Sequence, residues 1–240
     1  MMILKEQNMD ILLLYHYLKE QMNKFTTHMI NIETFVFNSF QENTYLLSDH
    51  TGECIIVDAG CQEEQEKDEL TDYLDEHGLK PVKLVNTHCH VDHILGVAYL
   101  ARKFDLPFII HPEEKSLFSH SRSQAEFFGL SLEQPPEPKA FLNDGDVLSF
   151  GESTLNVIHI PGHSPGGILF HSSEQNFLIS GDVLFRQSIG RTDLPGGDYD
   201  SLIGGIQTKL LGLEPETIVY PGHGPTTTIG EEKNTNPFLS

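Results

Sequence analysis

Cysteine and basic residues are both scarce in this chain of 240 residues. Three cysteines occur, Cys54, Cys61 and Cys89, and none has the CxxC spacing of a metal or redox motif. An odd number of cysteines argues against a disulfide framework and favours a reducing compartment, so we expect a cytoplasmic protein. Lysine and arginine number 15 against 35 aspartates and glutamates, which gives a formal net charge of -20. Because nucleic-acid backbones are bound by clustered basic side chains, we expect no nucleic-acid partner.

The N-terminal region lacks the long apolar run of a membrane anchor. Its apolar stretch at residues 11–14 is far shorter than the ~20 residues that a membrane span requires. Asp10 and Glu20 flank this stretch and no small-residue cleavage site follows, which argues against a signal peptide. We interpret residues 1–28 as an N-terminal helical extension and residues 29–240 as one catalytic domain, and we expect no membrane partner. With 38% hydrophobic residues, the chain can bury a full core.

Short β-rich segments alternate with helical ones from residue 32 onward. Apolar alternation predicts strands at residues 32–37, 44–47, 53–57, 82–85, 107–110, 147–150, 154–160, 167–170, 177–179 and 217–220. Helical spacing predicts helices at residues 63–77, 92–104 and 201–211, and proline-rich residues 118–138 are predicted to form a surface excursion. The two similar halves predict an α+β fold, a four-layer αββα sandwich in which two mixed sheets carry helices on their outer faces.

Four potential metal ligands lie within seven residues, in the sequence THCHVDH at positions 87–93. In an extended backbone alternate side chains share one face, so His88, His90 and Asp92 are predicted to converge. Cys89 lies between them and is predicted to point into the protein interior, where its role is structural.

Further candidate ligands recur where later strands are predicted to end. His163 and His223 each follow a Pro-Gly pair, and Asp182 follows Gly181. His93 begins a predicted helix, where the changed backbone period can turn its ring toward a second ion. A chance cluster on a polar loop would explain one HxH pair, but it does not explain seven ligands. The sequence therefore predicts a metal site built from four segments.

The heptapeptide at residues 87–93 resembles the HxHxDH signature of the metallo-β-lactamase superfamily. His163, Asp182 and His223 match the remaining ligand positions of that family. Asp58, in the segment Val-Asp-Ala-Gly, resembles an early family motif whose aspartate braces the ligand loop without binding metal. The strings SGDVLF, GRTD, PGHGP and NPF, at residues 180–185, 190–193, 221–225 and 236–238, are similar to those of short glyoxalase II-like hydrolases, which lack the C-terminal helical domain.

The resemblance implies two divalent metal ions. One ion is held by His88, His90 and His163, the other by Asp92, His93 and His223, and Asp182 bridges them. Zinc is our first expectation, although mixed imidazole and carboxylate ligands also suit iron or manganese. Four positive charges less two carboxylates leave about two, which favours a bridging hydroxide as the nucleophile at neutral pH. Asp92 and Asp182 are therefore the expected catalytic residues, and no GxSxG motif occurs in the chain.

The expected activity is hydrolysis of a small-molecule thioester of the hydroxyacylglutathione type. Full-length glyoxalase II enzymes grip glutathione with an additional C-terminal helical region, whereas this chain continues for about 17 residues after His223, so another thiol carrier fits equally well. Class B β-lactamases usually place cysteine where this chain has Asp182, so antibiotic hydrolysis is not expected. The alternatives are a mononuclear iron persulfide dioxygenase-like enzyme, a nuclease, which the acidic composition disfavours, and a non-catalytic metal-binding protein.

Four residues outside the ligand set are candidates for the pocket wall. Arg191 and Asp193 either form an ion pair that shapes the wall, or Arg191 meets an anionic part of the substrate. Phe127 and Phe128 could line an acyl pocket, but we expect this pair to anchor a loop to the core.

Overall fold

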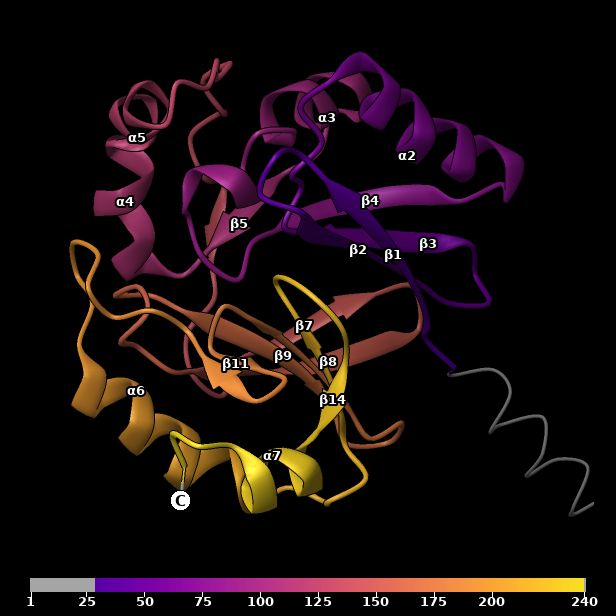
Figure 1. The fold of residues 1–240 in the computed structure, drawn as a ribbon. Coiled ribbons are helices and arrows are strands. Elements are labelled where there is room, and N and C mark those ends of the chain that lie inside the picture. Colours follow the sequence, from indigo (N-terminus) through magenta and orange to yellow (C-terminus); the bar gives the residue numbers. More distant parts are fainter. Residues whose placement is uncertain (1–28, 240) are drawn as a thin grey trace, which may run out of the picture.

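Successive side chains of a strand point to opposite faces of its sheet, and in central strands such as residues 53–57 and 177–181 the side chains on both faces are largely buried. The computed structural model describes residues 29–239, which form two sheets that face each other and carry helices on their outer sides (Figure 1). The predicted four-layer αββα sandwich is thereby confirmed. The helical extension predicted at residues 1–28 lies outside the described residues.

The first sheet has the strand order β1-β2-β3-β4-β5-β6 and is mixed. Its strands are β1 (Asn31–Phe37), β2 (Glu42–Ser48), β3 (Glu53–Val57), β4 (Lys80–Val85), β5 (Phe108–Ile110) and β6 (Ala140–Phe141). The first three strands pair antiparallel, and β3 to β6 pair parallel. Helices α2 (Glu64–Glu76) and α3 (Val97–Phe104) cover the outer face, since they connect these parallel strands (Figure 1).

The second sheet has the strand order β14-β13-β10-β9-β8-β7. Its strands are β7 (Val147–Phe150), β8 (Ser153–His159), β9 (Ile168–Ser172), β10 (Phe177–Gly181), β13 (Ile218–Pro221) and β14 (Thr227–Thr228). Only β10 and β13 pair parallel. Their connection contains the small hairpin β11 (Leu184–Phe185) and β12 (Ser188–Ile189), then α6 (Tyr199–Gly205) and a π-helical turn (Ile206–Leu210). Helix α7 (Ile229–Thr235) packs beside α6 on the outer face (Figure 1).

The core consists of layers on either side of each sheet. Leu47 and Val57 point between the sheets, where they join a cluster with Phe170 of the second sheet. Their neighbours Leu46 and Ile56 point the opposite way and pack in the cluster beneath the outer helices. Because both faces are covered, every residue of β2 is buried, including the polar residues Glu42, Asn43 and Thr44 at its start.

Helix boundaries differ most from prediction next to the ligand loop. The helix predicted from residue 92 begins only at Val97, because Val91–His93 forms a 3-10 turn instead. Gly96 packs so closely that an added Cβ would lie 2.9 Å from the carbonyl oxygen of Cys61. The chain must make this close approach before α3 can begin. The predicted helix 201–211 is likewise divided between α6 and the π-helical turn.

The surface excursion predicted at residues 118–138 is partly helical. It includes α5 (Ser121–Phe127), which follows a 3-10 turn (Pro112–Glu114) and α4 (Lys115–Ser119). The segment forms no strand between residues 118 and 138, as predicted, and its short helices lie together at one side of the molecule (Figure 1). None of the helices between residues 29 and 239 combines the length and apolar character that crossing a membrane requires.

Replacing Phe170 with alanine tests the packing between the sheets. Phe170 is fully buried, so Phe170→Ala should lower the free energy of unfolding by about 3–5 kcal/mol through lost burial and a residual cavity. Val36→Ala is the control, since Val36 is 61% exposed on β1, and should change stability by less than about 0.5 kcal/mol. Urea unfolding with a chelator present provides the measurement. Equal effects of the two substitutions would contradict the assigned core.

Candidate metal centre

The ends of four strands bring the predicted ligands together. The heptapeptide follows β4, His163 lies in the loop after β8, Asp182 follows β10, and His223 follows β13. The first of these strands belongs to one sheet and the other three to the second sheet, so the cluster lies where both sheets end. All seven predicted ligands meet there.

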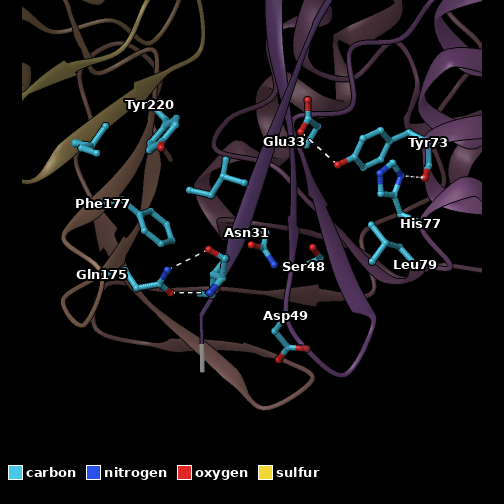
Figure 2. A pocket seen from close by; sticks show the side chains of 13 residues that line it. Asn31, Glu33, Ser48, Asp49, Tyr73, His77, Leu79, Gln175, Phe177 and Tyr220 are labelled. Carbon is cyan, nitrogen blue, oxygen red and sulfur yellow. Dashed lines mark hydrogen bonds between the residues drawn. The ribbon is translucent and has the colours of Figure 1, made fainter. Parts of the chain in front are cut away.

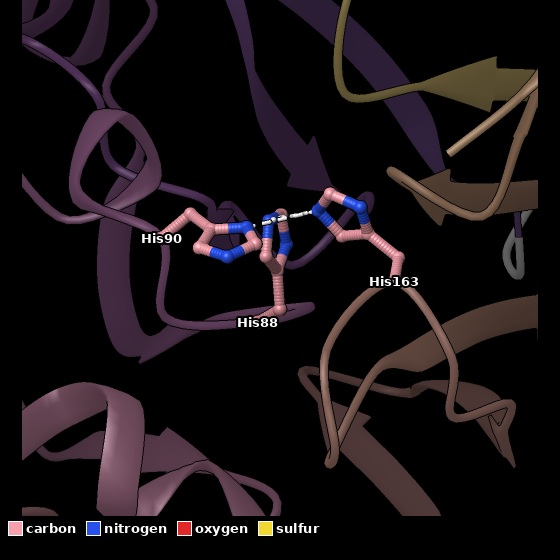
Figure 3. A group of neighbouring side chains, drawn as sticks. All are labelled: His88, His90 and His163. Carbon is pink, nitrogen blue, oxygen red and sulfur yellow. Dashed lines mark hydrogen bonds between the residues drawn. The ribbon is translucent and has the colours of Figure 1, made fainter. Parts of the chain in front are cut away.

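Three imidazoles form the first ligand group. His88 and His90 reach in from one loop and His163 from another, and their rings converge (Figure 3). The Nε2 atom of His163 lies 2.9 Å from Nδ1 of His90 and 3.2 Å from Nε2 of His88. Ligand atoms about 2.1 Å from a tetrahedral ion lie about 3.4 Å apart, so the spacing is close to that of a metal site.

Asp92, His93 and His223 form the second ligand group. The Oδ2 atom of Asp92 lies 3.2 Å from Nε2 of His223 and 3.7 Å from Nε2 of His93. The 3-10 turn at Val91–His93 explains why the heptapeptide contributes ligands to both groups. It ends the extended backbone after His90 and turns His93 toward Asp92 rather than toward His163.

Asp182 lies between the two groups. Its Oδ2 atom is 3.5 Å from Nε2 of His163 and 3.6 Å from Nε2 of His223, and its Oδ1 atom is 3.5 Å from Nε2 of His93. The residue therefore faces ligands of both groups with one carboxylate. Gly222 permits this approach, since an added Cβ there would collide with Oδ1 of Asp182 and lie 2.8 Å from Cε1 of His93.

Burial and neighbouring charges prepare these side chains to bind cations. Burial lowers the pKa of His90 to about 3 and also lowers the pKa of His88 and His163, which keeps the first group neutral at physiological pH. Burial alone would raise the pKa of Asp92, but the nearby His93 and His223 outweigh it and hold the carboxylate below its usual range. Neutral imidazoles and ionised carboxylates are the states that bind metal, so the first group and Asp92 are already in them. Burial lowers the pKa of His93 and His223, but the neighbouring carboxylates outweigh it and raise the pKa of both, so these two rings must release a proton when metal binds.

The donor set fits divalent metal ions. Within residues 29–239, two atoms that face the other ligands, Nε2 of His93 and Oδ1 of Asp182, are buried without a hydrogen-bond partner. Such unpaired buried atoms are costly unless another group satisfies them. Five imidazoles and two carboxylates in one buried cluster are the ligand types that zinc, iron and manganese accept.

Asp58 contacts the ligand loop from behind. Its Oδ1 atom accepts a hydrogen bond from the backbone N–H of Thr87 at 2.7 Å, and its Oδ2 atom accepts one from the Thr87 hydroxyl at 2.6 Å. The same Oδ2 atom lies 3.1 Å from Nδ1 of His93, on the far side of the ring from the ligand atom. This position suits an aspartate that orients ligands, as the resemblance implies.

Arg191 approaches the centre through its backbone. Its carbonyl oxygen lies 2.9 Å from Nδ1 of His163 and can accept a hydrogen bond from that ring. The guanidinium instead donates to both carboxylate oxygens of Asp193, at 2.8 and 2.9 Å. Of the two alternatives for this arginine, the ion pair is the one found in the structure.

Two buried glutamates near the centre were not recognised from the sequence. Glu114 accepts hydrogen bonds from the backbone N–H groups of Cys89 and Gly166, both at 2.7 Å, and so joins the two loops of the first ligand group. Oε1 of Glu42 lies 3.9 Å from Nδ1 of His93, and burial raises the pKa of Glu42 well above its usual value. Adjacent acidic residues at 113 and 114 give Glu114 the pattern of a surface residue, and no sequence signal marked either glutamate.

Asn43 and Phe40 hold the loop that carries His223. The side-chain amide of Asn43 donates to the carbonyl oxygens of Pro221 and Gly224, at 2.9 Å each. The carbonyl oxygen of Phe40 lies 3.1 Å from Nδ1 of His223. The β1–β2 connection therefore positions a ligand that comes from the other sheet.

Two large cavities lie in the described structure, and one of them borders the centre. A cavity of about 570 Å³ is lined by His90 together with residues of α4, α5 and the segment 194–196. Phe127 and Phe128 lie on its wall and are 83% and 44% exposed, so the expectation that this pair anchors a loop to the core is wrong.

The other cavity, of about 610 Å³, lies beside β1 and contains none of the seven ligands (Figure 2). There the side chain of Gln175 accepts a hydrogen bond from the backbone N–H of Ile30 at 2.7 Å and donates one to its carbonyl oxygen at 3.0 Å. These bonds fix the start of β1 against the second sheet.

Known proteins resemble the chain over nearly all of the described residues. Hydroxyacylglutathione hydrolase GloC of Haemophilus influenzae is 38% identical over 218 residues, which cover 88% of this chain and 99% of that protein. The structure of TTHA1623 in a di-iron-bound form shares 40% identity with a TM-score of 0.79, covering 86% of this chain and all of that one. The structure of the BLEG-1 B3 metallo-beta-lactamase shares 35% identity with a TM-score of 0.81, covering 88% and 100%.

The sequence profile of the metallo-beta-lactamase superfamily matches residues 38–223, a range that begins before β2 and ends at the last ligand. This match spans both sheets and contains all seven converging side chains. The chain therefore belongs to the metallo-β-lactamase superfamily.

Proposed function

We propose that the protein hydrolyses small thioesters with the help of two divalent metal ions. The observation that carries this proposal is the position of Asp182, whose carboxylate faces both ligand groups at 3.5 to 3.6 Å. The name of the relative GloC, a hydroxyacylglutathione hydrolase, supports a thioester substrate. The di-iron-bound neighbour supports two ions rather than one.

Thioester hydrolysis forms a bond between water oxygen and the acyl carbon, breaks the bond from carbon to sulfur, and delivers a proton to the departing thiolate. Bound divalent ions would supply a hydroxide nucleophile at neutral pH and polarise the carbonyl. Asp182 and Asp92 reduce the positive charge of the centre, and the ionised state of Asp92 is favoured by His93 and His223. Asp58 and Glu114 fix the ligand loops, so the donors need little reorganisation during the reaction.

Zinc remains our first proposal for the resident metal, and iron or manganese suits the same ligands because no thiolate is among them. The di-iron form of the neighbour at 40% identity makes iron the nearest competitor. We further propose a cytoplasmic location without nucleic-acid or membrane partners. The net charge of -20 and three free cysteines support this environment.

Two alternatives from the sequence are kept, and the comparisons add lactam hydrolysis as a third. A persulfide dioxygenase-like enzyme would use one iron, whereas the second ligand group and Asp182 favour a second ion. Lactam hydrolysis is raised by the name of the BLEG-1 neighbour, a B3 metallo-beta-lactamase. A non-catalytic metal-binding protein would need no substrate pocket, so the cavity beside His90 favours an enzyme over this alternative.

Metal analysis combined with a substrate panel tests the proposed function. The purified protein should contain two ions per chain and release thiol from small thioesters, and a chelator should abolish this release. The same panel includes glutathione persulfide with an oxygen electrode and a chromogenic β-lactam. One iron per chain with oxygen uptake, or turnover of the lactam alone, would contradict the proposal.

Asp182→Ala should remove the shared ligand and reduce thioester turnover by about a hundredfold or more, because two buried cationic sites lose their common carboxylate. Circular dichroism should show an unchanged fold. Asp72→Ala, on the exposed side of α2, is the matched control and should keep wild-type turnover. Wild-type turnover of Asp182→Ala would show that the two-ion mechanism is wrong.

Asp58→Ala should weaken metal binding by about 10- to 100-fold, since the ligand loop loses two hydrogen bonds and His93 loses its neighbouring carboxylate. Competition with a chromophoric chelator measures the affinity. The same Asp72→Ala variant controls for the loss of one negative charge. An affinity equal to that of the wild type would remove Asp58 from the orienting role.

The three thiols should be unreactive in the folded protein. Burial raises the pKa of Cys54 and Cys61 to about 12 and raises that of Cys89 well above its ordinary value, so none is a thiolate at neutral pH. Ellman's reagent at pH 8 should modify no cysteine in the native state and all three in guanidinium chloride. Rapid modification of Cys89 in the native protein would reopen a nucleophilic role for it.

A further inference from the structure

The cavity of about 570 Å³ beside the metal centre is bounded by two parts of the chain. Helices α4 and α5 form one wall, and Pro165 with the segment 194–196 forms the other. Figure 1 shows α4 above the orange loop that leads to α6, which contains this segment. His90 is the one predicted ligand that lines the cavity, so the space opens directly onto the first ligand group. Its volume lies within the range of about 300–1,000 Å³ that is typical of small-molecule sites.

The wall of this cavity is apolar and uncharged. Among the described residues that line it, none is a lysine, arginine, aspartate or glutamate. Its longer polar side chains already have partners in the backbone of α4. Gln124 donates to the carbonyl oxygen of Leu117 at 3.1 Å, and Nδ1 of His120 lies 2.7 Å from that of Ser116. The groups left to face a ligand are therefore mainly hydrocarbon surfaces.

A row of aromatic rings connects the cavity to the second ligand group. Phe127 packs edge-to-face on Phe128 at 5.1 Å, and Phe128 packs edge-to-face on Phe40 at 5.4 Å. The backbone of Phe40 in turn contacts the His223 ring. Phe127 is 83% exposed at the outer end of this row. Clustered exposed apolar side chains next to a cavity mark a binding surface.

We infer that this cavity binds an apolar acyl chain of the thioester substrate, and this inference rests on the proposed function. A carboxylate-rich thiol such as glutathione would meet no cationic side chain here, so its charged groups would lose water without gaining a partner. The thiol portion therefore points away from the cavity toward solvent. The acyl chain occupies the cavity and gains the free energy of apolar burial.

A series of acyl thioesters of N-acetylcysteamine tests this inference, because the thiol portion is uncharged and constant. Acetyl, butanoyl, hexanoyl and octanoyl thioesters should show kcat/KM rising by about two- to fourfold for each added CH2 until the cavity is filled. Phe127→Ala should lower kcat/KM for the octanoyl ester by about tenfold and leave the acetyl ester unchanged. Release of free thiol provides the rate.

Phe238→Ala is the matched control, because Phe238 is 44% exposed and does not line the cavity. It should leave the rates for both esters at wild-type values. Titration calorimetry with non-hydrolysable S-alkyl thioethers of the same lengths measures binding without turnover. Affinity should rise with chain length in the wild type and rise less steeply in Phe127→Ala.

The two proposals fail in different ways. If no thioester is hydrolysed but the thioethers still bind more tightly with length, the proposed reaction is wrong and the apolar site stands. If acetyl and octanoyl esters react equally and the thioethers bind equally, the cavity inference is wrong while thioester hydrolysis stands. A Phe127→Ala variant with the wild-type chain-length dependence would also overturn the inference.

Discussion

The carboxylate of Asp182 can face both ligand groups only because strand ends from two sheets meet at one edge. His88 to His93 follow β4 of the first sheet, whereas Asp182 follows β10 of the second, and the atoms must come within a few ångströms of one another. The apolar layer around Phe170 holds the two sheets together, and hydrogen bonds from one sheet to the loops of the other fix the positions of the ligands. Asn43 of β2 holds the His223 loop by two hydrogen bonds, which links sheet pairing directly to ligand placement. Shifting one sheet relative to the other would separate the two ligand groups.

Without bound metal, this cluster of buried polar groups lowers the stability of the folded protein. Burial lowers the pKa of the imidazoles in the first group, and among the described residues Nε2 of His93 and Oδ1 of Asp182 have no hydrogen-bond partner. Bound cations would satisfy these groups and stabilise the folded state, so metal affinity and folding stability are coupled. The residues behind the ligands offset part of this loss of stability by hydrogen-bonding the ligand loops. Asp58 and Glu114 each accept two hydrogen bonds that fix a loop, and neither needs to touch a metal ion.

The sequence predicted the layers and the ligand cluster well, because both depend on short-range patterns. Apolar patterns located every described strand of three or more residues and missed the two-residue strands β6, β11, β12 and β14. The HxHxDH motif places four ligands within a few residues of backbone. The predicted start of the helix after the motif was wrong, because packing with a distant part of the chain overrides the local helical pattern there. A helix pattern runs through residues 92–96, but close packing of Gly96 against Cys61 delays α3 until Val97. Glu42 and Glu114 were missed since a buried, hydrogen-bonded glutamate has no distinguishing spacing in the sequence.

The same contrast separates metal binding from substrate selection. Metal ligands must present particular donor atoms, so their residue types are restricted and a motif reveals them. The cavity requires only uncharged surface of a certain shape, which leucine, proline and phenylalanine supply from segments far apart in the chain. Phe127 and Phe128 therefore looked like core anchors, and only their exposure beside His90 distinguishes the two roles. Since the ligand set can serve several reactions, the apolar wall is the part of this site on which the proposed substrate preference depends.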